Sequence, residues 1–270
     1  ILDPLLIFGL GPFPRLELTG AAVATVIARA ITFIVSLAVL YFREKLISFK
    51  IPKIHEILYS WKHIIYIGLP SAGTNIIVPF SAGIITRLVA EYGKEAVAAY
   101  GVGSRIEIFA ITIIIALSSV LSPFIGQNLG AKKISRIKTA IKVSGIFSFG
   151  WGIFLIVIFM FLSQPIATIF NTNPVIISNV ELYLIIFSFS YGLQGIFHFS
   201  TTAINVLHKP LHSAFFSLLR MIGIFIPLAF IGSHFFGLIG IFVAGSFANI
   251  VSGAFTYLWL YRFINKIKTN

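Results

Sequence analysis

Most of the lysine and arginine residues of this chain fall in alternate gaps between long apolar runs. A helix needs about 20 apolar residues to cross a bilayer, and seven runs reach or approach that length: 21–42, 64–90, 98–126, 143–162, 180–208, 210–232 and 238–261. The gaps 43–62 and 131–142 hold five cations each, whereas 163–179 and 232–240 hold none. Cationic loops stay on the cytoplasmic side of a membrane. The pattern therefore predicts an all-α polytopic membrane protein whose C-terminus is cytoplasmic.

The composition supports a membrane protein rather than a nucleic-acid binder. Hydrophobic residues make up 58% of the chain and charged residues 10%, against about 25% charged in a soluble domain. The net charge of +12 comes mainly from the predicted cytoplasmic segments, where membrane topology accounts for it. We therefore expect the lipid bilayer, and not a nucleic acid, as the partner. The chain has no cysteine, which excludes disulfides and thiolate chemistry.

The first residues have the character of a helix that is already inside the membrane. The stretch 1–9 reads ILDPLLIFG and ends at a turn, so its helix would need about ten more residues upstream to span. With Ile at position 1, we expect this chain to be the C-terminal portion of a longer protein.

A weak internal repeat relates the two ends of the chain. The segment 19–41 resembles 239–261, with identities that include Gly20/Gly240, Ala24/Ala244 and Tyr41/Tyr261. Six crossings separate equivalent helices, so the two halves run in the same direction, as in the parallel repeats of secondary transporters. By subtraction, about four helices belong upstream. The predicted organisation is two N-lobe helices (1–42), a cytoplasmic interfacial linker helix (43–63) and a C-lobe of six transmembrane helices (64–270). The linker has apolar residues at helical spacing, and a cytoplasmic extension of the next crossing explains it equally well.

Several motifs resemble the multidrug and toxic compound extrusion (MATE) family. They are AVAAYGVGSRIE (96–107), SPFIGQNLGAKK (122–133), GLP (68–70), DPLLIFG (3–9) and GAAVAT (20–25). The resemblance implies helices five to twelve of a twelve-helix transporter with two six-helix lobes around a central cavity. It also implies export of small organic compounds against inflow of H⁺ or Na⁺, with no other cofactor. We expect a multi-pass protein of the prokaryotic plasma membrane that is a monomer when complete, and not an enzyme.

Asp3 is the leading candidate for the coupling residue. An ionisable side chain inside a membrane is costly and is by default a functional candidate, because burial favours the neutral form and permits proton exchange near neutral pH. Asp3 lies about 9 Å below the turn at Gly9, and Thr25 lies about 7–8 Å deep on the next helix. In the family branch that the sequence resembles, the matching positions belong to an N-lobe cation or proton site. The alternative is a structural pair between Asp3 and Arg29.

A C-lobe ion site is not expected. Another branch of the family has carboxylates on its seventh and tenth helices, where this chain has Val78 and Gly195. The internal repeat agrees, because Ile226 precedes Pro227 where Asp3 precedes Pro4.

Glu107 is the second acidic residue that the apolar runs place inside the membrane. We interpret it as part of a structural ionic cluster with Arg87 and Arg105, although residues two apart on a helix do not face each other. A proton relay is the alternative.

Four polar residues are candidates for the lining of the cavity: Asn75, Gln194, His198 and Asn205. The last three share one face of a predicted helix. Hydrogen bonds between helices explain them as well. No spacing of residues indicates a metal site.

The motifs favour a cation-coupled antiporter that exports organic, cationic or amphipathic compounds. The alternative within the same superfamily is a flippase of a lipid-linked or polysaccharide intermediate. A channel is disfavoured because no helix has a wholly polar face.

Overall fold

The structure is a computed structural model that describes the chain except residues 1, 10, 13, 48–51 and 267–270, and except the side chains at 67, 70, 71, 74 and 75. The described residues form helices, turns and short irregular segments, with no strand among them. Two compact units are present, Ile1–Trp61 and Lys62–Asn270. The predicted all-α architecture is confirmed.

The first unit is a short helix packed on a long one. Helix α1 (Leu2–Phe8) is followed by a turn at Gly9, whose φ of 69° favours glycine. Helix α2 (Glu17–Ala38) ends in a π-helical turn, η1 (Val39–Arg43). The two helices approach closely at Gly20, because a Cβ there would lie 2.4 Å from the carbonyl oxygen of Leu6. Small residues permit such contacts between membrane helices.

Helix α3 (Ile54–Ala90) begins in the segment interpreted as a linker and continues without interruption to Ala90. The part of the predicted linker from residue 54 onward is therefore helical and continuous with the next apolar run.

Helix α6 (Pro174–Val206) is the centre of the second unit, and it packs against α4 (Lys94–Gly130), α5 (Ile134–Phe170) and α8 (Ile226–Lys266). Glycines make these contacts close. A Cβ on Gly152 of α5 would lie 2.5 Å from the Cα of Gly192, and one on Gly253 of α8 would lie 2.2 Å from the carbonyl oxygen of Leu193. The core between the helices is rich in large buried rings, including Tyr183 and Tyr191.

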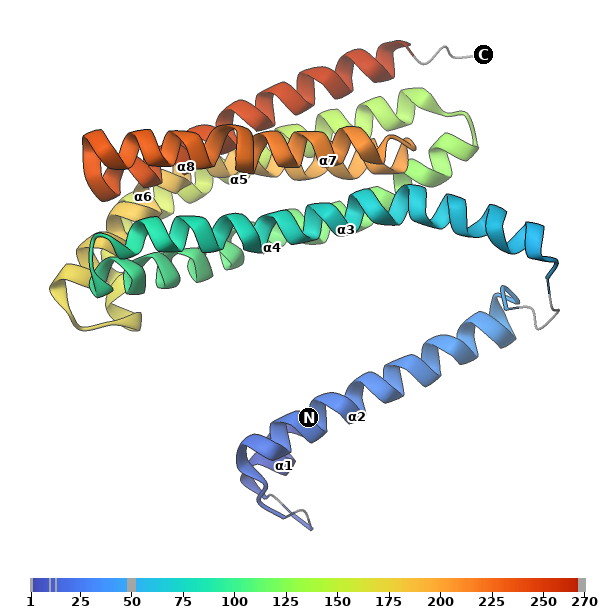
Figure 1. Ribbon diagram of the computed structural model, residues 1–270, viewed down its shortest axis with the longest axis horizontal. Coiled ribbons are helices and arrows are strands. Elements are labelled where there is room, and N and C mark those ends of the chain that lie inside the picture. The colour runs from blue at the N-terminus through green and yellow to red at the C-terminus, as the bar shows by residue number, and fades with distance from the viewer. Residues whose placement is uncertain (1, 10, 13, 48–51, 267–270) are drawn as a thin grey trace. The chain divides into compact units, whose positions relative to one another are not determined.

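The last part of the chain is a hairpin of two long helices. Helix α7 (Pro210–Leu218), the π-helical η2 (Leu219–Phe225) and α8 form one segment, Pro210–Lys266, that is broken only at Gly237 (φ 63°, ψ −142°). The chain turns back there (Figure 1), and Gly232 meets Gly240 across the turn. This segment therefore contains two of the predicted crossings, and Gly237 lies in the cation-free gap predicted between them.

The outer surface is apolar. Five segments among the described residues are long and apolar enough to cross a membrane. Large side chains such as Phe161 and Ile169 are 78% and 80% exposed. Exposed apolar surface on this scale requires lipid around it, so the chain is a multi-pass membrane protein.

Candidate functional site

A groove in the first unit brings Asp3 and Thr25 together. The groove is lined by Leu2 and Asp3 of α1 and by residues of α2: Ala24, Thr25, Ala28, Arg29, Ile31 and Thr32. Thr25, Arg29 and Thr32 lie four and three residues apart, so helical geometry places them on one face of α2. The close contact at Gly20 holds α1 against this helix. Asp3 and Thr25, the two residues predicted as the coupling site, thus line the same groove, together with a second hydroxyl from Thr32.

The Asp3 carboxylate is not paired with Arg29. Ion pairs within 4.0 Å among the described residues are Arg15–Glu17, Arg43–Glu44 and Lys94–Glu95, so the alternative structural role for Asp3 has no ion pair to support it. The hydroxyl groups of Thr25 and Thr32 donate to the carbonyl oxygens of Ala21 and Ala28, at 2.9 and 2.8 Å. Their oxygens keep lone pairs that can face a cation.

The oxygen donors of this groove suit a small hard cation. A carboxylate and hydroxyl oxygens are ligands for Na⁺-like or hydronium ions, and the same carboxylate can instead take a proton. Clusters of three or more His, Cys, Asp or Glu side chains that could hold a metal are absent from the part of the chain that the structure describes.

A second groove lies beside the helix crossing at Gly240, the repeat equivalent of Gly20. It lies at the turn between the two parts of α8 and is lined by Leu228, Ile231, Gly232, Phe236, Ile239, Gly240, Val243, Ala244 and Phe247. Among the residues that line the first groove, only Ala24 has its repeat equivalent, Ala244, in the lining of the second, and Ile226, the equivalent of Asp3, does not line it. Both grooves are hollows beside a close helix crossing at a glycine, Gly20 or Gly240. The charged residues of the first groove, Asp3 and Arg29, have uncharged equivalents in the repeat, Ile226 and Asn249, whereas the hydroxyl of Thr32 has a counterpart in Ser252.

Glu107 of α4 is the centre of a polar cluster inside the second unit. Both carboxylate oxygens accept hydrogen bonds from α6: Oε2 from the hydroxyl of Tyr183, and Oε1 from Nε2 of Gln194 at 2.9 Å. Tyr183 and Gln194 are eleven residues apart, which is three helical turns, so they lie on the same face of α6. The arrangement holds α4 and α6 together.

Arg220 of η2 supplies the positive charge near this cluster. Its Nη1 donates to Oδ1 of Asn249 at 3.0 Å, and its guanidinium lies 4.6 Å from the centre of the Phe197 ring. The guanidinium is buried and interacts electrostatically with Glu107. The predicted cluster of Glu107 with Arg87 and Arg105 is not observed among the described residues, since Glu107 faces α6.

The two arginines of the predicted cluster lie elsewhere. Arg105 is exposed, because a side chain two positions before Glu107 points to a different side of α4. Arg87 is also exposed, and it lines a hollow with Glu91, Ile84, Leu88 and Phe230.

The predicted cavity residues do not form one group. Gln194 is buried and bonds to Glu107, which is the helix-to-helix role given as the alternative. His198 is partly buried on the same helix, and Asn205 is exposed near its end. The side chain of Asn75 lies outside the described residues.

Sequence reasoning did not identify Tyr183 and Arg220. Arg220 left a signal, as a cation in the middle of the apolar run 210–232. Tyr183 left none, because tyrosine is an ordinary residue in a membrane helix.

Comparisons with known proteins agree with this architecture. The family model described as MatE matches residues 70–231. A protein of Shewanella oneidensis named FAD transporter is 35% identical over 268 residues, which cover 99% of this chain and 59% of that protein. The multidrug export protein MepA of Staphylococcus aureus is 30% identical over 249 residues, which cover 89% of this chain and 52% of that protein.

A solved structure has the same fold. A mutant of the Vibrio cholerae MATE transporter VcmN superposes with a TM-score of 0.89 at 27% identity, covering 99% of this chain and 60% of that one. The chain thus spans between half and two thirds of the length of these relatives.

Proposed function

Because the chain belongs to the MatE family of membrane transporters, we propose that it works as part of a cation-coupled antiporter that exports organic compounds, with Asp3 as the coupling carboxylate. The proposed substrates are cationic or amphipathic molecules, and the proposed coupling ion is H⁺ or Na⁺. The multidrug export proteins among its relatives support export of such compounds. The proposed location is the bacterial plasma membrane, where a cation gradient can drive the exchange.

The contrast between Asp3 and its repeat equivalent, Ile226, is the observation that carries the assignment of Asp3. The groove between α1 and α2 contains the Asp3 carboxylate, and the repeat-equivalent position is Ile226, which cannot carry a charge. A packing requirement common to both repeats would not place a carboxylate in only one of them. An ionisable group in a membrane helix needs a functional reason to be kept.

The proposed role of the site follows from the change in charge of Asp3 when it binds and releases the cation. Asp3 and the oxygen of Thr25 bind the cation when the groove is open to the outside, and binding neutralises the carboxylate. The protein then changes to the state of the alternating-access cycle that is open to the inside. Release of the cation inside restores the negative charge. Organic substrate and coupling ion then alternate, and export is driven by the cation gradient.

The test compares two carboxylates in cells that express the gene encoding this chain and lack other exporters. Asp3→Asn preserves size but cannot cycle a proton, so we expect loss of gradient-driven dye efflux at normal expression and normal dye binding. Thr25→Ala removes one neutral ligand, so we expect a smaller loss. Glu107→Gln, matched for expression, should retain transport. Near wild-type efflux by Asp3→Asn together with failure of Glu107→Gln would show that the coupling residue had been wrongly assigned.

A dinucleotide is the second candidate substrate. The Shewanella relative named FAD transporter matches nearly the entire chain. The same cells distinguish the two candidates, because extracellular FAD is measured by fluorescence while dye efflux is followed in parallel. Export of FAD without dye efflux would select the dinucleotide.

A further inference from the structure

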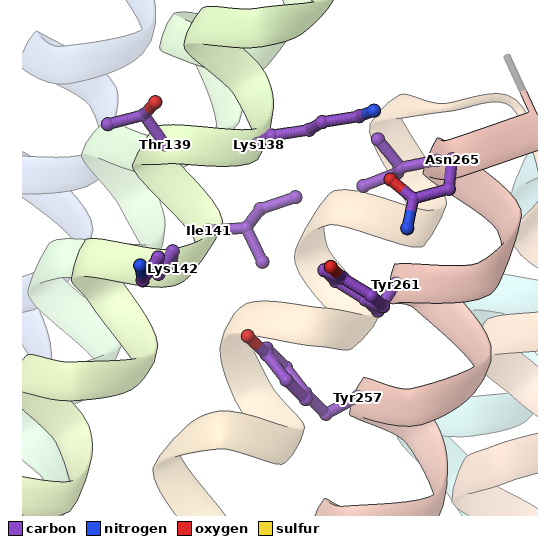
Figure 2. A pocket seen from close by; sticks show the side chains of 8 residues that line it. Lys138, Thr139, Ile141, Lys142, Tyr257, Tyr261 and Asn265 are labelled. Carbon is purple, nitrogen blue, oxygen red and sulfur yellow. The ribbon is translucent and has the colours of Figure 1, made fainter.

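A basic groove of the second unit lies between the beginning of α5 and the end of α8. Both helices pack on α6 and leave a hollow lined by Lys138, Thr139, Ile141, Lys142, Tyr257, Tyr261, Ile264 and Asn265. Figure 2 shows Lys138 extending toward Asn265, with the hydroxyl ends of Tyr257 and Tyr261 directed toward α5. Ile141 and Ile264 are buried and contribute an apolar floor.

Among the residues that line this groove, Thr139 donates its hydroxyl to the carbonyl oxygen of Ser135 at 3.1 Å, and five other side chains keep their hydrogen-bond donors free within the described part of the chain. Lys138 and Lys142 are one helical turn apart on α5, and the rings of Tyr257 and Tyr261 are stacked 6.4 Å apart on α8. Within the part of the chain that the structure describes, the side chains of these four residues and of Asn265 make no hydrogen bond or ion pair. Five side chains therefore present donors to one hollow.

The lining of the groove contains no acidic residue. Glu181 is the only acidic residue after Glu107 in the sequence. Glu181 lies in the first turns of α6. The C-terminal end of α6, which leads into α7, is on the order of 35 Å further along the helix. At physiological ionic strength, interactions between charges in water are largely screened beyond about 8 Å. Glu181 therefore does not neutralise the two lysines.

The groove is at the depth of lipid headgroups. Helix α5 has 37 residues and is about 55 Å long, which exceeds a hydrocarbon core of about 30 Å. Lys138 and Lys142 lie in its first turns, so they extend beyond the hydrocarbon, and tyrosine favours the same interface. Gly145 follows Lys142 on α5 and faces the ring of Tyr257. A Cβ added to Gly145 would lie 3.8 Å from that ring. The hollow can therefore continue toward the hydrocarbon beside a small residue.

We propose that this groove binds the headgroup of an anionic phospholipid in the cytoplasmic leaflet. The two ammonium groups bind the phosphate, the tyrosine hydroxyls and the Asn265 amide donate to its oxygens, and the acyl chains lie along the exposed apolar sides of α5 and α8. Basic hollows between membrane helices on the cytoplasmic side are suited to such headgroups. The proposal does not depend on Asp3 or on the transported compound.

Native mass spectrometry of the purified protein tests the proposal. The protein is mixed with equal amounts of a phosphatidylglycerol and a phosphatidylcholine that have the same acyl chains, and bound lipids are counted. Each cation near an anionic lipid contributes roughly a fivefold gain in affinity. We therefore expect Lys138→Gln/Lys142→Gln to weaken phosphatidylglycerol binding about 25-fold and to leave phosphatidylcholine binding unchanged.

The matched control is Lys132→Gln/Lys133→Gln, which removes the same charge from the adjacent turn but leaves the groove intact. It should bind phosphatidylglycerol like the wild type. Tyr257→Phe/Tyr261→Phe removes only two hydroxyls and should weaken binding less than the lysine pair. Equal loss in both lysine pairs, or no preference for phosphatidylglycerol in the wild type, would overturn the proposal. Displacement of the lipid by inorganic phosphate at equal concentration would also overturn it, since it would identify a site for free anions.

Discussion

The Glu107 cluster predicts that two replacements of the same residue will differ greatly in stability. Glu107→Leu removes both acceptors, so the Tyr183 hydroxyl and the Gln194 amide lose their shared partner and the buried Arg220 loses its nearby negative charge. Hydrogen bonds between membrane helices contribute about 0.6 kcal/mol on average and up to about 1.7 kcal/mol. A buried donor left unsatisfied adds about 1–3 kcal/mol. We expect Glu107→Leu to lower the free energy of unfolding by about 3 kcal/mol.

Glu107→Gln should cost far less. The new amide keeps one acceptor oxygen for Tyr183 and adds an NH₂ group that points at Gln194. Oε1 of Gln194 has no hydrogen-bond partner within the described residues, so this side chain can rotate its amide and accept from the new NH₂ group. Both variants remove the negative charge near Arg220, so the difference between them reports the hydrogen bonds. In Glu107→Gln one hydrogen bond is retained and the other is reversed, and this variant should be about 2 kcal/mol more stable than Glu107→Leu.

The assay is unfolding in mixed micelles with increasing dodecyl sulfate, followed by tryptophan fluorescence. Glu181→Leu and Glu181→Gln are the matched controls, because Glu181 makes no hydrogen bond or ion pair within the described part of the chain. Both should unfold near the wild-type midpoint. If Glu107→Leu is as stable as the wild type, or if Glu107→Gln is as unstable as Glu107→Leu, the carboxylate does not join α4 to α6 in the way described.

Two further predictions concern packing and topology. Gly240→Ala should destabilise the protein by about 1–3 kcal/mol, because the added Cβ would lie 1.9 Å from the carbonyl oxygen of Gly232; Gly150→Ala, whose Cβ meets nothing within 4 Å, is the control and should be neutral in the same unfolding assay. In the cysteine-free chain, Ser135→Cys should react with a membrane-impermeant thiol reagent only after cells are opened, and Asn171→Cys should react in intact cells. Labelling of position 135 from outside would contradict the predicted orientation.

The helices could be predicted from the sequence because a helix that crosses a membrane must be a long run of apolar residues. The runs 98–126 and 143–162 lie inside α4 and α5, which extend further at both ends. The ends were missed because charged and polar residues remain helical where they leave the hydrocarbon. The continuity of α3 through Ile54–Ala90 cannot be predicted from the sequence, since an amphipathic segment before a crossing has the same pattern whether or not the helix is interrupted.

The two candidate clusters differed in how far the sequence could define them. Asp3 and Thr25 lie on neighbouring helices joined by a short turn, so counting residues from Gly9 and Gly20 was enough to place them together. Glu107 and Tyr183 are 76 residues apart, and their contact depends on how α4 rotates against α6. Spacing along the chain carries no information on that rotation. The predicted partners of Glu107 therefore rest only on position: Arg105 is close in sequence, and Arg87 is near the end of the preceding helix.

The turn at Gly237 has a consequence for biogenesis. Gly232 and Gly240, which make backbone contact there, are only eight residues apart, so closing this loop costs little chain entropy. Contacts of such short range form early compared with long-range ones. The two halves of the hairpin are therefore suited to pair as soon as the ribosome has released them, and to enter the bilayer as one preassembled unit that docks on α6 afterwards.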